Sequence, residues 1–224
     1  MPLKRNMKRA SAKFNLSLAL INTLALKVCF PFSLIFLAHK RVGHSSLWGL
    51  NDLPASIDIL LTIILFDFFI YWQHRLFHKI PFLWKFHAPH HSEKNLHSTT
   101  ALRFHPIEII LSGVLKMILI TLFMPSAFAY FIYEVLLSSM AIFTHSNLAL
   151  PKRLEQRLRK IFVTPSMHTP HHSPHIELTN SNFGNFLSIW DYLFRTYRPE
   201  INSEFGLKNY PEDSFKNLIF HPFI

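Results

Sequence analysis

The stretch IDILLTIILFDFFIYW at Ile57–Trp72, followed after one glutamine by HRLFH, decides the fold. Two similar apolar stretches come later, IEIILSGVLKMILITLF at Ile107–Phe123 and AFAYFIYEVLLSSMAIF at Ala127–Phe143. Each has 16 or 17 residues and only one or two charges. A helix of this length spans about 25 Å, a short crossing of a ~30 Å hydrocarbon core. The sequence therefore predicts transmembrane helices.

The composition of the chain supports a membrane protein. Half of its 224 residues are hydrophobic, with 23 phenylalanines and 5 glycines. The net charge of +10 comes largely from the N-terminus and the segments that flank the apolar stretches. Such charge fits adhesion to anionic lipid better than nucleic-acid binding, for which we find no recognition motif. The single cysteine, Cys29, excludes a disulfide framework.

We expect an all-α integral membrane protein with about four transmembrane helices under a cytosolic helical cap. The first apolar segment, 14–38, contains Lys27 and Pro31. It forms either one kinked span or an interfacial helix followed by a re-entrant piece. The expected parts of this single domain, 1–224, are that segment, a second span at 54–73, a metal-binding segment at 74–105, a third span at 107–123, a fourth span at 127–144 and the cap at 145–224.

Basic residues predict the orientation of the chain. Lysines and arginines precede the first apolar segment, which places the N-terminus in the cytoplasm by the positive-inside rule. Met124-Pro125-Ser126 joins the third and fourth spans in a tight hairpin. With four crossings, the metal site and both termini lie on the cytoplasmic side. Lys40 and Arg41 fall outside in this topology, a mild contradiction.

Histidines form three tight clusters beside these spans. They are His74 and His78 in HRLFH, His87, His90 and His91 in HAPHH, and His168, His171 and His172 in HTPHH. Imidazole is the commonest protein metal ligand and suits Fe, Zn, Cu or Ni. Because eight clustered imidazoles exceed what one ion holds, the sequence predicts a two-metal centre at a membrane face.

Further candidates complete the predicted site. His145, at the end of the fourth span, is our choice for a ninth ligand, with His105 as its competitor. The Pro106 that follows suits His105 to a structural cap. His175 lies in a polar loop, as an outer-shell or solvent-facing residue. We expect Pro89 and Pro170 to open helices, with the paired histidines in the first turn.

Asp67, Tyr71, His74 and His78 follow one another at steps of 4, 3 and 4 and form one helical stripe. A carboxylate beside ligating imidazoles commonly accepts the other ring N–H, so we place Asp67 and Tyr71 in the outer shell. The alternative is an ion pair of Asp67 with Arg75 or Lys116.

The absence of other motifs narrows the chemistry. HRLFH has no glutamate after its first histidine, so it is not the HExxH motif of zinc peptidases. The sequence has no ExxH pair of the carboxylate-rich di-iron bundles. A nitrogen-only dinuclear site beside lipid suits O₂ activation for attack on an unactivated C–H bond. The alternative is a histidine-rich membrane metal transporter or storage protein, whose site would lie near the bilayer midplane.

At these residues the chain resembles the fatty acid hydroxylase/sterol desaturase superfamily of membrane di-iron enzymes. The resemblance covers roughly Asp67 to Tyr197. The motifs that carry it are DFFIYWQHRLFH, FHAPHHSEK, TALRFHPIEI, THSNL, VTPSMHTPHHS, TNSNFG and WDYLFRTY. One departure is Arg195, where the superfamily usually has glycine.

The resemblance implies an O₂-dependent oxidoreductase that hydroxylates or desaturates a membrane lipid, fatty acyl, sterol-like or another alkyl lipid. It implies two iron ions, with zinc as a substitute in isolated protein, held by the eight clustered histidines and less firmly by His145. It also implies a separate ferredoxin- or cytochrome-type electron donor.

Two predictions concern charges. We expect the donor to dock on basic residues of the cytoplasmic face, at Arg153, Arg157, Arg159 and Lys160. Lys116 and Glu134 each lie nine residues from Pro125, so an antiparallel hairpin places them at the same depth. Since a lone charge there costs ~3 kcal/mol, we expect the two to face each other or to share a polar cluster with Asp67.

Overall fold

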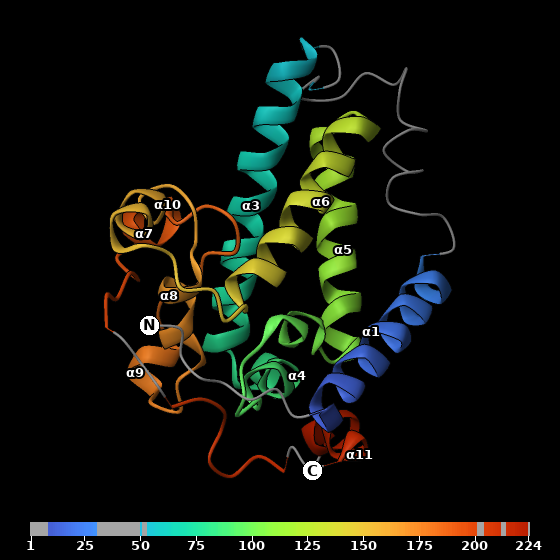
Figure 1. The fold of residues 1–224 in the computed structure, drawn as a ribbon. Helices are drawn as coiled ribbons and strands as arrows, with labels where there is room; N and C mark the ends of the chain where they lie inside the picture. The colour runs from blue at the N-terminus through green and yellow to red at the C-terminus, as the bar shows by residue number, and fades with distance from the viewer. Residues whose placement is uncertain (1–8, 31–49, 51–52, 201–203, 212–213, 224) are drawn as a thin grey trace.

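The computed structural model describes residues 9–30, 50, 53–200, 204–211 and 214–223, which are helical with irregular connections (Figure 1). The long helices are α1 (Arg9–Cys29), α3 (Ala55–Lys79), α5 (Pro106–Phe123) and α6 (Ala127–Thr144). The shorter ones are α4 (Pro81–His91), α7 (Lys152–Leu158), α8 (Pro165–His168), α9 (Ile176–Thr179), α10 (Ile189–Leu193) and α11 (Phe215–Phe220), with 3₁₀ turns η2 (Ser98–Leu102), η3 (Thr169–His172) and η4 (His221–Phe223).

The four long helices are long and apolar enough to cross a membrane, in agreement with the expected number of about four. In α1 the qualifying stretch is Ser11–Cys29, which begins before residue 14, and residues 31–38 of the expected first segment lie outside the described part. Helix α3 continues through HRLFH to Lys79, as predicted. Exposed Leu16, Leu20 and Leu24, at steps of four, give α1 an outward apolar stripe that suits contact with lipid.

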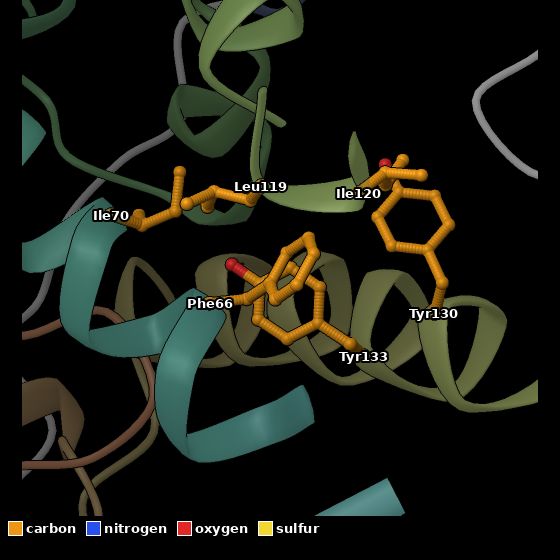
Figure 2. Packing of buried hydrophobic residues seen from close by; sticks show 6 residues of the cluster. All are labelled: Phe66, Ile70, Leu119, Ile120, Tyr130 and Tyr133. Atoms are coloured by element: carbon orange, nitrogen blue, oxygen red, sulfur yellow. The ribbon is translucent and has the colours of Figure 1, made fainter. Parts of the chain in front are cut away.

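Aromatic and aliphatic side chains hold α3, α5 and α6 together. Phe66 of α3 packs against Tyr130 and Tyr133 of α6, with its ring centroid 5.6 and 5.2 Å from theirs (Figure 2). Leu119 and Ile120 of α5 belong to the same buried cluster. The end of α3, the start of α5 and the end of α6 lie at the same end of the bundle as α4 and α8 (Figure 1).

The α5–α6 hairpin is tight, as predicted. Met124 ends α5 in the left-handed conformation with φ of 46°, and the hydroxyl of Ser126 accepts from Ala129 N at the start of α6. Asp58, buried near the start of α3, accepts from Ser126 N at 3.2 Å. The hairpin is therefore anchored to α3 at the end of the bundle that lies opposite α4 and α8.

Lys116 and Glu134 face each other across this hairpin, which confirms their predicted pairing. Nζ of Lys116 lies 2.7 Å from Oε1 and 2.9 Å from Oε2 of Glu134. The hydroxyl of Tyr130 donates to Oε1 of Glu134 at 2.7 Å. Asp67 forms its hydrogen bonds elsewhere, with residues of the segment before and within α10, and does not join this cluster.

Candidate metal centre

The nine predicted ligand histidines converge in two groups whose ring nitrogens lie within 4.8 Å of one another. Group A consists of His74, His78, His87, His91 and His171. Group B consists of His90, His145, His168 and His172. The structure thus brings together residues that lie up to 98 positions apart in the chain (172 minus 74).

Helical spacing explains how each cluster is divided. On α4, His87 and His91 are four residues apart, share one face and belong to group A, whereas His90 belongs to group B. Around η3 the same spacing sends His168 and His172 to group B and His171 to group A. Each HxxHH cluster therefore contributes to both groups, and the two candidate metal positions are neighbours.

The expectation that Pro89 opens a helix is wrong. Helix α4 begins at Pro81, and Pro89 lies inside it, so the paired histidines occupy its last turn. Proline keeps a helical φ, and only two helical residues follow it, so the local cost is small. The guanidinium of Arg103 donates to the Pro89 carbonyl at 2.8 Å and supplies a partner at this helix end. Pro170 does lie in the first turn of η3, as expected.

Hydrogen bonds fix the tautomers of four histidines. Nδ1 of His74 donates to the Phe183 carbonyl at 2.8 Å, and Nδ1 of His171 donates to the Ser181 carbonyl at 2.7 Å. Nδ1 of His145 donates to the Ala141 carbonyl at 2.7 Å. Since a carbonyl can only accept, the proton of each neutral ring lies on Nδ1 and the lone pair on Nε2. Nδ1 of His87 lies 2.8 Å from Oε1 of Glu108, and an ionised carboxylate there can only accept, which gives the same tautomer.

Burial keeps the histidines of groups A and B that lie outside the candidate spans uncharged. It lowers the pKa of His87 to about 3 and that of His145 to about 4. The pKa values of the other five such histidines lie well below the usual range for the same reason, with like-charge repulsion adding to it; these are His90, His91, His168, His171 and His172. Neutral imidazole is the form that binds a metal.

The spacing of the ring nitrogens fits metal ligation. Nε2 of His74 lies 3.0 Å from Nε2 of His171, and Nε2 of His145 lies 3.1–3.2 Å from three Nε2 atoms of group B. At the contact of His74 with His171 both Nε2 atoms carry lone pairs, which cannot form a hydrogen bond with each other. Two ligands at right angles around an ion with bonds of about 2.1 Å lie about 3.0 Å apart. The donor set and its spacing therefore suit one transition-metal ion in each group.

Asp67 does not contact a histidine of either group, contrary to expectation, and in the described part of the chain it does not pair with Arg75 or Lys116. Its carboxylate accepts from Phe186 N at 3.2 Å, Leu187 N at 3.0 Å and the Trp190 indole at 2.8 Å. The carboxylate of Asp191 accepts from Phe183 N and Gly184 N. The two carboxylates hold the 181–187 segment, whose carbonyls orient His74 and His171. Asp67 therefore supports the site indirectly, through this segment.

The remaining predicted outer-shell residues lie apart from the two groups. The Tyr71 hydroxyl forms a hydrogen bond with that of Thr196 at 2.8 Å, and its ring packs on Phe183. His105 caps α5: its Nδ1 accepts from Ile107 N, and its Nε2 lies 3.0 Å from the Ile219 carbonyl. The structure thus brings His145, and not its competitor His105, to group B. The exposed His175 lies 3.4 Å from Glu204.

Sequence reasoning missed three residues that shape the site. Glu108 orients His87, the ring of Phe104 stacks on His90 with centroids 4.4 Å apart, and Arg103 bridges Pro89, Ser92 and Glu93. All three lie in the quoted motif TALRFHPIEI. The available signal was a glutamate in the first turn of an apolar span, one turn after His105.

Two arginines that the sequence singled out have specific local roles. Arg159, predicted to meet an electron donor, lies 2.6 Å from Glu155 and donates to Tyr197 and Ser166, so it joins α7 to neighbouring segments. Arg153, Arg157 and Lys160 are exposed. Arg195 has φ of 56°, the left-handed conformation that favours glycine, which explains why this position usually carries glycine in the resembled superfamily.

A cavity of about 430 Å³ leads from the histidines into the bundle. Near the site it is lined by His74, His87, His90, His145 and His168. Farther along, side chains of α1, α3, α5 and α6 line it, and Lys116 and Glu134 belong to that lining. An apolar chain that enters the bundle can therefore reach the candidate metal positions.

Comparisons with known proteins point to one family. The sequence profile of the fatty acid hydroxylase family matches residues 59–196. The ornithine lipid hydroxylase OlsE of Rhizobium tropici is 28% identical over 203 residues, which are 89% of this chain and 60% of that protein. The alkylglycerol monooxygenase of Xenopus tropicalis is 35% identical over 142 residues, 62% of this chain and 30% of that protein.

The lathosterol oxidase of Rattus norvegicus is 27% identical over 177 residues, 76% of this chain and 56% of that protein. The chain thus covers less than two thirds of the length of each of these relatives. No solved structure matches. Because the family profile covers more than half of the 224 residues, the chain belongs to the fatty acid hydroxylase family.

Proposed function

We propose that this chain is a membrane lipid hydroxylase that uses O₂ and two iron ions, one in group A and one in group B. The observation that carries the proposal is the convergence of nine neutral imidazoles at the mouth of a cavity that runs between apolar helices. Hydroxylation is favoured over desaturation because two of the similar proteins are named for oxygen insertion, OlsE and the alkylglycerol monooxygenase. All three are named for oxidising lipids.

Different residues of the chain would have different roles in this reaction. The nine histidines of groups A and B would hold the metals, and bound iron would supply the oxidising power towards an unactivated C–H bond that no side chain offers. The carbonyls of Ser181 and Phe183 hold two rings in the tautomer that binds metal. Apolar walls of the cavity exclude water and place one carbon of the lipid chain beside the histidines.

The site lies at one end of the helix bundle, where the ends of α3 and α6 meet α4 and α8 (Figure 1). A transport site would be expected near mid-depth, so this position argues against the metal transporter or storage protein. Both termini and the site would face the cytoplasm under the predicted topology. A separate ferredoxin- or cytochrome-type donor would supply electrons there, at the exposed Arg153, Arg157 and Lys160.

The test is turnover of the iron-loaded chain in bilayers made from lipids of its host. We expect O₂ consumption that requires both lipid and a reducing partner. When the gas supplied is ¹⁸O₂, the product lipid should contain one ¹⁸O atom, detected by mass spectrometry. A product that has lost two hydrogens without gaining oxygen would assign desaturation instead. Metal transport into sealed vesicles without lipid oxidation would overturn the proposal.

A further inference from the structure

The cavity ends at a charged pair that the proposed chemistry does not use. Lys116 lies eight residues beyond Glu108 on α5, about 12 Å from the histidine end. Glu134 lies eleven residues before His145 on α6, about 16 Å from that end. Both side chains line the same cavity as the histidines. The cavity therefore has the histidines at one end and a charged pair at the other.

The pair remains accessible from the cavity. The side chains of Lys116 and Glu134 are 15% and 28% exposed, so neighbouring side chains do not seal them off. An ammonium carries three N–H donors, and Glu134 accepts at both of its oxygens. A donor of Lys116 and a lone pair of the carboxylate are thus left for a ligand.

A short polar row continues from the pair towards the histidines. Ser112 lies one helical turn before Lys116 on α5, and Ser138 lies one turn after Glu134 on α6. Both serines line the cavity. Hydroxyls and charges at this depth favour a ligand with a polar group over a plain hydrocarbon, since an alkane offers them no hydrogen bond.

Charge balance defines the polar group. A carboxylate or phosphate would place an uncompensated negative charge beside a pair that is already neutral, and an amine would do the same with the opposite sign. A hydroxyl both donates and accepts, so it satisfies lysine and glutamate together. We propose that Lys116, Glu134, Ser112 and Ser138 form a binding subsite for a hydroxyl group on the chain of the lipid substrate.

This inference rests on the proposed lipid hydroxylation and narrows its substrate class. The substrate would be a long-chain alcohol or a hydroxyacyl lipid whose hydroxyl lies about 12–16 Å from the carbon beside the histidines. The distance from the pair to the histidines would then determine which carbon of the lipid lies beside the candidate metal positions.

Equilibrium binding of two matched probes tests the subsite without any turnover. Radiolabelled 1-hexadecanol and n-hexadecane differ only in the hydroxyl, and each is titrated against the purified full-length chain in one detergent. We expect the chain to bind hexadecanol about tenfold to a hundredfold more tightly than hexadecane, as for a hydrogen bond to a charged group. The Lys116→Met/Glu134→Gln double variant should lose this preference and bind hexadecane unchanged.

Milder variants guard against a folding defect. Ser112→Ala/Ser138→Ala keeps the ion pair and should lower the preference by a smaller factor. Ser139→Ala is the matched control, because Ser139 is exposed and does not line the cavity. A preference for hexadecanol that survives in both double variants, or is absent in the native chain, overturns the subsite and leaves Lys116–Glu134 as a clamp between helices. Failure to oxidise lipid with the preference intact would overturn the proposed function alone.

Discussion

Within each group, Nε2 atoms of different histidines lie 3.0–3.2 Å apart, and each proposed ligand can be tested one residue at a time. His171 belongs to group A and His90 to group B. We expect His171→Ala and His90→Ala each to lower the metal content of the chain from about two ions to about one, because each removes a ligand from a different ion. Metal analysis by mass spectrometry of the purified variants measures this.

His175→Ala is the control for that pair of variants, because the His175 ring is exposed, lies 3.4 Å from Glu204 and belongs to neither group. It should retain the metal content of the native chain. Full metal content together with full activity in either ligand variant would exclude that histidine from the centre.

Glu108 provides a second prediction at the scale of one residue. It orients His87 by accepting from Nδ1, and outer partners of this kind commonly contribute tenfold to a hundredfold to metal affinity. We expect Glu108→Ala to lower the affinity of group A about tenfold or more, whereas Glu108→Gln should retain most of it because the amide oxygen still accepts. Competition with a chromogenic chelator measures both affinities.

The exposed Glu177 supplies the matched control, and Glu177→Gln should leave metal affinity unchanged. Equal affinities of the native chain and Glu108→Ala would mean that the carboxylate does not support the site.

Helices α5 and α6 are joined by a charged contact whose strength can be isolated. Removing either Lys116 or Glu134 leaves the other charge without its partner, which costs about 1–3 kcal/mol of folding stability. We expect Lys116→Met and Glu134→Gln each to destabilise the chain by that amount and the double variant to recover at least half of the summed loss. Unfolding in a fixed detergent measures the coupling.

Lys27 is exposed near the end of α1 and provides the comparison. Lys27→Met combined with Glu134→Gln should show simple additivity. If the Lys116 cycle is equally additive, the contact contributes nothing to stability.

At the scale of elements, candidate spans could be predicted from sequence because hydropathy and length are local properties. The pairing of Lys116 with Glu134 could be predicted because both lie nine residues from Pro125 in the turn. The partners of Asp67 could not, because the residues that it contacts lie 119 to 123 positions away. The last turn of α4 was placed wrongly because Pro81 already opens the helix and Pro89 is tolerated near its end.

The metal site, too, could be predicted from sequence only in part. Clustering at short helical spacing was sufficient to choose eight of the nine histidines that converge, and the ninth, His145, was chosen by its place at the end of the fourth span. The roles of Glu108 and Phe104 depend on how α4 packs against α5 and the loop before it. That packing is decided by tertiary contacts that no periodicity encodes.

For the molecule as a whole, burial of neutral histidines predicts acid sensitivity. The pKa of His87 is about 3 and that of His145 about 4 in the fold, against about 6.5 in an unfolded chain. Their contribution is fully present above pH 6.5 and is lost as the pH falls, because only the unfolded chain takes up the protons. Between pH 6.5 and 5 each costs about 2 kcal/mol. Melting temperatures of metal-free protein should fall accordingly, and a flat profile would contradict this.

The electron donor is the second prediction at this scale. Arg153, Arg157 and Lys160 are exposed on and beside α7, whereas Arg159 is occupied by Glu155. Since attraction between exposed charges is screened by salt, we expect turnover with an acidic donor to fall as ionic strength rises and to fall further in a variant with these three charges neutralised. Arg159→Gln should instead lower stability. Salt-independent turnover would exclude electrostatic docking.

The division of the histidines between two groups has a consequence for the order in which the protein is made. Four members of group A lie at or before His91, so they emerge early from the ribosome, while three members of group B come only with His145, His168 and His172. One metal position is thus nearly complete when fewer than half of the 224 residues exist, and the other must wait for the last third of the chain. Nascent chains halted after residue 144 would carry the first quartet of imidazoles and a single imidazole of the second.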